Sequence, residues 1–161
     1  MAKVSIPKPK PGDEIVDAKE KVYDDYKAKP GEKALVMMHT VPYEGSVGLV
    51  NLLTCTRLVR KGYDLTLCLY GPGVLMASGA RGFPTVGDDP FPGCLAINNQ
   101  IKTIMKEGGK VTACRFAMAA LYGKREDDLI EGVRGINPLD VLDCLIEHQR
   151  AGALIIATWT L

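Results

Sequence analysis

The sequence predicts an α/β fold in which about five mainly parallel strands form one sheet with helices on both of its faces. Short apolar runs, typical of strands buried on both sides, alternate with segments whose apolar residues recur at helical spacing. Glycine or proline stands at most of the boundaries between them. This alternation favours βαβ units with right-handed crossovers. The 161 residues fit a single domain.

The predicted domain spans residues 33–161, and an extended segment rich in proline and charge precedes it over residues 1–32. Within that segment, residues 13–28 have the composition of a polar helix. The strands are expected at 34–39, 64–70, 110–114, near Val133 and at 153–158. The helices are expected at 46–60, 95–106, 116–121, 126–131 and 138–151.

The last helix carries the clearest boundary signals. Asn137 is a favourable N-cap, Pro138 suits the first helical position, and Gly152 marks the end. The same segment predicts which side of the helix is buried, and it places His148 on the polar, solvent-facing side. The apolar stripe is expected to consist of Leu139, Leu142, Leu145 and Ile146.

Composition and charge exclude several classes of protein. The net charge of +1 gives no overall field that would attract nucleic acid or an anionic membrane. No segment approaches the roughly 20 apolar residues that a membrane span needs, and the start lacks the apolar core of a signal peptide. Five cysteines without C-x-x-C spacing argue against a disulfide framework or a zinc ribbon, and for reduced thiols in the cytoplasm. We expect neither a metal nor a cofactor.

Polar or reactive side chains stand at the carboxyl ends of three predicted strands, where sheets of this kind bind ligands. His39 ends the first strand, Tyr70 and Gly71 close the second, and Cys114 ends the third. We therefore expect a ligand site at this edge of the sheet. For His39 two interpretations stay open: a ligand-orienting or acid–base group, and a packed, hydrogen-bonded histidine.

Cys114 is the candidate catalytic residue. It stands where a strand ends and a helix begins, with Arg115 beside it. Free helix N–H groups and a nearby cation both favour the thiolate, so Cys114 should alkylate before the other cysteines. The alternative is that Cys114 is a small buried hydrophobe, which is the usual environment of a free cysteine.

A long loop, dense in glycine and proline, is predicted from Gly71 to Gly93. Gly71 and Gly73 favour a tight turn first and an anion cradle second. The loop is expected to fold over the strand ends as a lid. Its apolar residues would then face the site or an adjoining subunit; they are Leu75, Met76, Phe83 and Phe91.

The helix that follows this loop adds two candidates for ligand binding. Cys94 opens the helix and shares the argument for a thiolate, and Asn98 can line a pocket. The alternative for Cys94 is a helix-start residue packed beneath the loop. A redox or relay pair with Cys114 would require the two sulfur atoms to meet, which the sequence does not decide.

Two stretches carry a resemblance to a known family. Leu69–Val74 stands at the end of the second predicted strand, and Val111–Cys114 runs into Ala119–Gly123. Over residues 34–161 the chain resembles the DsrE/DsrF-like family of small sulfur-relay proteins. The resemblance implies a DsrE-like three-layer fold, and it matches Cys114 by context to the cysteine that carries persulfide sulfur in the active members.

Three further stretches resemble a subgroup described as nitrogen-starvation response proteins, which are encoded near a nitrilase. They are Gly71–Gly79, Pro92–Gln100 and Leu154–Leu161. The subgroup implies homo-oligomers, commonly trimers or hexamers, and no known reaction. The chain departs from the sulfur-relay members in its proline-rich start and its longer loop over residues 71–93.

Two functional classes follow from the residues and the resemblance together. The leading hypothesis is a non-catalytic oligomer of the nitrogen-starvation response, which binds a small ligand or a protein partner from nitrogen metabolism. It leads because the sequence specifies no second catalytic group. The alternative is a sulfur carrier or thiol transferase that uses Cys114, and uptake of sulfur from a persulfide donor would separate the two.

Overall fold

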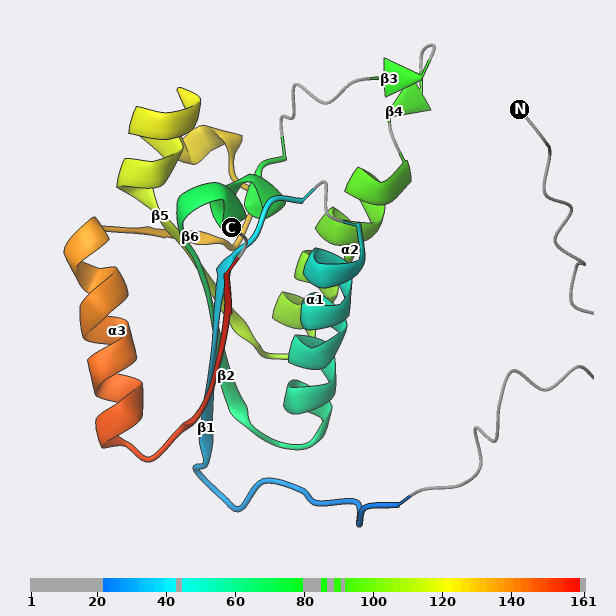
Figure 1. Cartoon of the computed structure of the whole chain (residues 1–161), viewed down its shortest axis with the longest axis vertical. Helices are drawn as coiled ribbons and strands as arrows, with labels where there is room; N and C mark the ends of the chain where they lie inside the picture. The colour runs from blue at the N-terminus through cyan, green and yellow to red at the C-terminus, as the bar shows by residue number, and fades with distance from the viewer. Residues whose placement is uncertain (1–21, 43–44, 80–84, 87–88, 91, 160–161) are drawn as a thin grey trace, which may run out of the picture.

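The computed structural model describes residues 22–42, 45–79, 85–86, 89–90 and 92–159. Five parallel strands form one sheet in the order β6-β5-β2-β1-β7 (Figure 1). They are β1 (Lys33–His39), β2 (Asp64–Leu69), β5 (Lys110–Cys114), β6 (Arg134–Ile136) and β7 (Leu154–Trp159). A separate antiparallel pair consists of β3 (Thr85–Val86) and β4 (Asp89–Pro90).

Helices lie on both faces of the sheet, as predicted. α1 (Gly45–Arg60) and α2 (Pro92–Lys106) cover one face, and α3 (Pro138–Arg150) lies on the other (Figure 1). Three short helical segments complete the described chain: η1 (Gly71–Ala77) and η3 (Glu126–Asp128) are 3-10 helices, and η2 (Ala117–Leu121) is π-helical. None of the described helices is long and apolar enough to cross a membrane.

The alternating side chains of β1 divide the core into two parts. Ala34, Val36 and Met38 belong to a large cluster with α1 and α2, whereas Leu35 and Met37 belong to a small cluster beneath α3. Successive residues of a strand point to opposite faces, so apolar residues at every position bury both faces of β1. The small cluster also holds Cys68 of β2 and, from α3, the residues Val141, Cys144 and Leu145.

The boundaries of α3 confirm its predicted start. The Asn137 side-chain oxygen accepts a hydrogen bond from the Leu139 amide at 2.9 Å, and the Asp140 carboxylate accepts one from the Asn137 amide at 2.9 Å. Pro138 follows at the first helical position. These two bonds form a capping box, which satisfies amide groups that the helix itself leaves without a partner.

The predicted orientation of α3 is wrong. Leu139 and Leu142 are 75% and 59% exposed, and His148 is only 7% exposed. The helix carries two overlapping stripes, and the one that packs on the sheet is built from Val141, Cys144, Leu145 and His148. Its spacing of three, four and seven residues is as regular as that of the leucine stripe. Because that stripe contains a cysteine and a histidine, it is less apolar than the leucine stripe, and an argument based on hydrophobicity selected the leucines instead.

Other predicted elements differ in extent. The helix expected over 126–131 is a single 3-10 turn, and the short strand expected at Val133 begins at Arg134. Residues 71–77, predicted as loop, form the 3-10 helix η1. Residues 22–28, the described part of the expected polar helix, are not helical.

Two glycines allow η1 to pass close to the end of β1. A Cβ atom on Gly73 would lie 2.2 Å from the Met38 carbonyl oxygen, and one on Gly71 would lie 2.3 Å from His39 Nε2. Gly71 also has a positive φ of 50°, which disfavours other residues. Both glycines, predicted as ligand-binding, therefore have a structural reason to be glycine.

We expect Gly73→Ala to destabilise the fold. The added methyl group meets a backbone carbonyl of β1, so the protein must shift its backbone, at a cost of about 1–3 kcal/mol. The melting temperature measures this loss, at roughly 2–4 °C for each kcal/mol in a chain of this size. Gly79→Ala is the matched control, because a Cβ there has no neighbour closer than 3.6 Å. Equal melting temperatures for the two variants would contradict the close approach.

Candidate functional site

The register of the sheet brings three predicted site residues level on adjacent strands. Met38 of β1 pairs with Leu69 of β2, and Leu69 pairs with Ala113 of β5. The next residue along each strand is His39, Tyr70 and Cys114, in that order across the sheet. The His39 and Tyr70 rings are in contact, with centroids 5.0 Å apart and planes tilted by 58°. Cys114 is 5% exposed.

Arg115, which was expected to activate the thiol, is paired with a carboxylate. Its guanidinium forms an ion pair with the Glu126 carboxylate, and Arg115 Nη2 donates to Glu126 Oε2 at 3.2 Å. Both side chains are about half exposed. The positive charge beside Cys114 is therefore largely balanced by a carboxylate.

Asn98, another predicted ligand-binding residue, does not share a cavity with Cys114. Asn98 Nδ2 donates to the Ser78 carbonyl oxygen at 3.4 Å, and Asn98 lines a cavity of about 730 Å³ beside Lys102 and Ile130. Cys114 is not among the lining residues of that cavity. The side chain of Cys94 lies outside the described residues, so its relation to Cys114 stays a prediction.

The described part of the predicted lid is a fixed element. Within η1, Val74 and Met76 are buried, and Leu75 is half-buried. Two backbone hydrogen bonds tie the end of this segment to the end of η3 and the residues after it: Ile130 N donates to Ala77 O at 2.8 Å, and Gly79 N donates to Asp128 O at 2.7 Å. Phe83 and Phe91 lie outside the described residues, and closure by that part of the loop stays a prediction.

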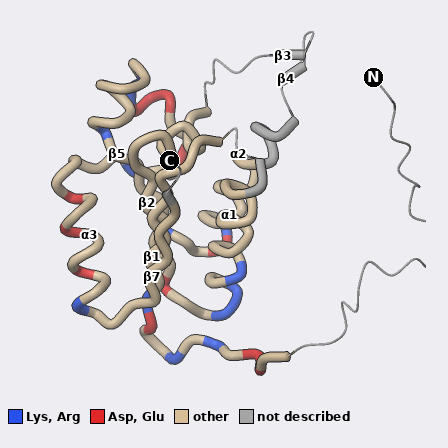
Figure 2. Tube along the Cα trace, in the orientation of Figure 1, with Lys and Arg blue, Asp and Glu red and all other residues tan. Residues whose placement is uncertain are grey.

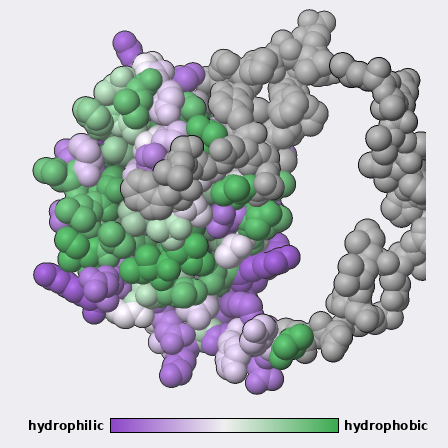
Figure 3. Space-filling model, viewed as in Figure 1, coloured by the Kyte–Doolittle hydropathy of each residue, from purple (hydrophilic) through white to green (hydrophobic). Residues whose placement is uncertain are grey.

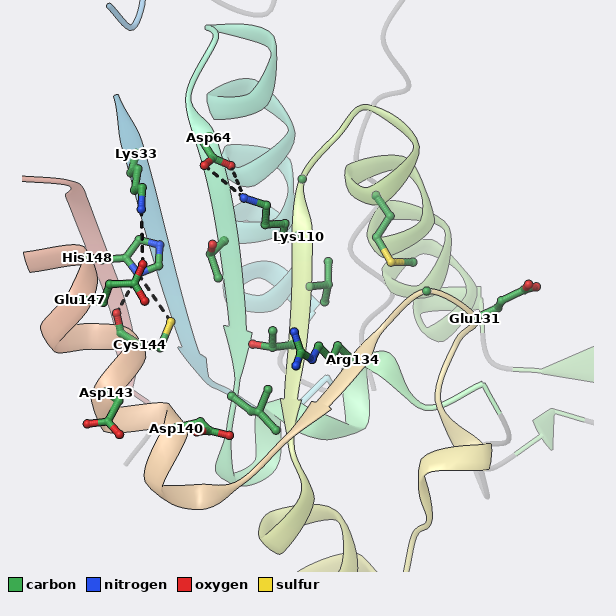
Figure 4. A pocket seen from close by; sticks show the side chains of 17 residues that line it. Lys33, Asp64, Lys110, Glu131, Arg134, Asp140, Asp143, Cys144, Glu147 and His148 are labelled. Atoms are coloured by element: carbon green, nitrogen blue, oxygen red, sulfur yellow. Dashed lines mark hydrogen bonds and ion pairs between the residues drawn. The ribbon is translucent and has the colours of Figure 1, made fainter. Parts of the chain in front are cut away.

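Sequence reasoning missed a cluster of two thiols and an imidazole beneath α3, of which Figure 4 labels Cys144 and His148. Cys144 and His148 stand one helical turn apart on the buried side of α3, and Cys68 of β2 lies opposite them in the small core cluster. His148 Nδ1 is 2.7 Å from the Cys144 carbonyl oxygen and 3.6 Å from Cys144 Sγ. A carbonyl oxygen can only accept, so Nδ1 carries a proton that Cys144 Sγ also approaches.

The surroundings of the two thiols shift their pKa values in opposite directions. A hydrogen bond from the Cys68 thiol lowers the pKa of Cys144 to about 6, and the charge and hydrogen bond of His148 act in the same direction against burial. The same contact, together with burial, raises the pKa of Cys68 far above its usual range. These shifts favour the thiolate form of Cys144 and the protonated thiol form of Cys68.

Cys144 lines a groove of about 750 Å³ between α3 and the strands β2, β5 and β6 (Figure 4). Much of the acidic charge of the groove comes from α3 (Figure 2), which contributes Asp140, Asp143 and Glu147. Two of its cations are paired: Lys33 with Glu147 at 3.4 Å, and Lys110 with Asp64 at 2.9 Å. The groove is thus polar at its rim and presents a thiolate on one wall.

The spacing of Cys144 and His148 was the signal in the sequence that could have revealed this cluster. Residues four apart share a helix face, and the alternation of β2 sets Cys68 opposite to Leu67 and Leu69. The wrong orientation of α3 concealed it. Among the described residues, no group of three or more His, Cys, Asp or Glu side chains could hold a metal ion.

The comparisons with known proteins support the fold. The scan against family models finds no match, and the search of curated proteins finds none either. The chain is similar to the crystal structure of the YchN protein of Escherichia coli, with a TM-score of 0.59 and 21% sequence identity. The match covers 79% of this chain and 99% of YchN. YchN has the DsrE-like fold, so the α/β architecture described above is DsrE-like.

We expect Cys144, rather than Cys114, to be the first cysteine to react near neutral pH. Its thiolate forms as the pH rises through about 6, so its alkylation rate should be half-maximal there and level off about two units higher. Peptide mapping after limiting iodoacetamide, repeated across this pH range, measures the profile. Cys55 is the internal control, because burial raises its pKa to about 12. The ordinary pKa of a cysteine is 9.0. If the alkylation rate of Cys144 still rose steeply at that pH, the lowered pKa of Cys144 would be contradicted.

Proposed function

We propose that the protein is a sulfur carrier that holds sulfane sulfur as a persulfide on Cys114. The observation that carries the proposal is the position of Cys114 at the carboxyl end of a central strand, level with Tyr70 and His39. This is the edge at which parallel α/β sheets bind ligands. The π-helical segment η2 begins three residues later, and such segments occur frequently at functional sites.

The chemistry requires one transfer and no cofactor. The Cys114 thiolate attacks the outer sulfur of a donor persulfide, R–S–SH. The sulfur–sulfur bond of the donor breaks, Cys114–S–SH forms, and R–S⁻ leaves. Burial raises the pKa of the Tyr70 hydroxyl, so this group stays protonated. It can then donate a hydrogen bond to the persulfide anion on the neighbouring strand.

The mass of the intact protein after incubation with a persulfide donor tests this proposal. We expect the gain of one sulfur atom, mapped to Cys114 and lost in Cys114→Ser. Cys55→Ser is the control, since Cys55 is fully buried on the inner side of α1 and its pKa is raised to about 12. The assignment would be refuted if the wild-type protein gained no sulfur atom. It would also be refuted if the Cys114→Ser variant still gained one.

A second candidate is the non-catalytic, partner-binding oligomer of the nitrogen-starvation response that the sequence resemblance implies. The exposure of apolar side chains on one face favours it. Leu139 and Leu142 of α3 are largely exposed, and Leu154 of the edge strand β7 is 43% exposed. Figure 3 shows apolar residues gathered on the face that carries α3 and β7. Exposed apolar surface and an unpaired strand edge are both typical of association sites.

For this candidate we expect light scattering to give a mass above the 17.4 kDa of one chain at micromolar concentration. The double variant Leu139→Glu, Leu142→Glu should lower that mass, because it places charges in the apolar surface. The matched control is Lys102→Glu, which alters the charge on the opposite face of the sheet. A single-chain mass for the wild-type protein would exclude the oligomer.

A further inference from the structure

The cluster of Cys68, Cys144 and His148 lies apart from the strand-end site and needs its own explanation. Cys144 is half-buried and lines the groove, whereas Cys68 is fully buried behind it. A reagent that enters the groove therefore meets Cys144 first. The second thiol belongs to the small core cluster against which Cys144 packs.

We propose that this groove is a site of thiol–disulfide exchange, in which Cys144 attacks a small disulfide and Cys68 resolves the product. His148 holds the Cys144 thiolate in place through Nδ1, 3.6 Å from the sulfur. The imidazole is itself fixed by the Cys144 carbonyl oxygen at 2.7 Å and by burial. This role is separate from persulfide transfer at Cys114.

The exchange proceeds in two balanced steps. The Cys144 thiolate attacks one sulfur of R–S–S–R, so that Cys144–S–S–R forms and R–S⁻ leaves. Cys68 then attacks Cys144 Sγ, a disulfide forms between the two residues, and the proton of Cys68 leaves with the second R–SH. The protein loses two electrons, and the small disulfide is reduced to two thiols. A sulfur–sulfur bond of about 2.05 Å requires the two side chains to rotate toward each other within the small core cluster that they share.

The charges of the groove indicate which disulfides it accepts. Lys33 and Lys110 are already paired with carboxylates, but Arg134 has no ion-pair partner among the residues that the structure describes. Figure 4 shows Arg134 and Cys144 on the same side of the sheet, on facing walls of the groove. A guanidinium binds carboxylates through paired hydrogen bonds. We therefore assign the substrate class as disulfides of small thiols that carry a carboxylate.

The size of the groove agrees with this class. Its volume of about 750 Å³ lies within the range of roughly 300–1,000 Å³ that is common for small-molecule sites. Thr66 and Thr112 line its floor on the sheet, so the floor is polar. A small polar ligand can therefore lie along the sheet between Arg134 and Cys144 without burying unpaired groups.

Oxidised glutathione is the probe, and the full chain is the sample. In the wild-type protein we expect loss of two hydrogens and a disulfide that maps to Cys68 and Cys144. Cys68→Ser should instead trap one glutathione on Cys144, and Cys144→Ser should show neither product. Because Cys68 lies in the core, Cys68→Ala serves as a second variant, and melting curves identify which variants are folded. A glutathione that attaches elsewhere, or a wild-type protein that stays fully reduced, would overturn the proposal.

Two further variants test the positioning residue and the substrate class. His148→Gln should slow the reaction near pH 7 by roughly tenfold for each unit by which the pKa of Cys144 rises, and move the pH profile upward by the same amount. Arg134→Gln should slow the reaction several-fold with oxidised glutathione and leave it unchanged with hydroxyethyl disulfide, which has no carboxylate. Arg57→Gln, on the opposite face of the sheet, is the matched control. Equal rates of Arg134→Gln and wild-type protein with oxidised glutathione would refute the substrate class.

Cys114→Ser distinguishes this site from the persulfide site. It should abolish sulfur uptake from a persulfide donor and leave exchange with oxidised glutathione intact. If Cys114→Ser removes both reactions, the groove is not an independent site. If it removes neither, the persulfide assignment fails while the exchange site stands.

Discussion

In the described chain, the single helix α3 covers one face of a sheet whose other face is covered by α1 and α2. One helix spans about 10 Å with its side chains, and five strands spaced at about 4.8 Å extend over twice that width. The fully buried members of the small core cluster lie on β1 and β2, and the same face of β5 and β6 borders a groove. The polar floor formed by Thr66 and Thr112 fits this uncovered position. The orientation of α3 and the surroundings of Cys68 both follow from this arrangement.

The orientation of α3 does not bury the most apolar side chains of the helix. Placing Val141, Cys144, Leu145 and His148 on the sheet leaves Leu139 and Leu142 exposed, although leucine gains more than histidine from burial. The buried histidine is tolerated because Nδ1 is hydrogen-bonded to the Cys144 carbonyl oxygen. The exposed leucines make a second contact surface available on the outer side of the helix.

Much of the fold could be predicted from the sequence because its signals are local. The apolar run of β1, the Asn137-Pro138 start of α3 and the glycines that end helices depend on a few neighbouring residues. The convergence of His39, Tyr70 and Cys114 also followed, since parallel strands align their carboxyl ends. The cluster of Cys68, Cys144 and His148 could not be predicted in this way, because it depends on which of two similar stripes of α3 packs on the sheet. That choice depends on contacts between residues 76 positions apart, such as Cys68 and Cys144.

The two thiol sites differ in how the fold presents them. Cys114 lies at the strand ends, where backbone groups and Tyr70 surround it and its neighbouring cation is paired with Glu126. Cys144 lies over the face of the sheet, where a buried proton donor and an imidazole fix its charge state. The two cysteines therefore face different surfaces of the protein: Cys114 the carboxyl ends of the strands, and Cys144 the groove beneath α3.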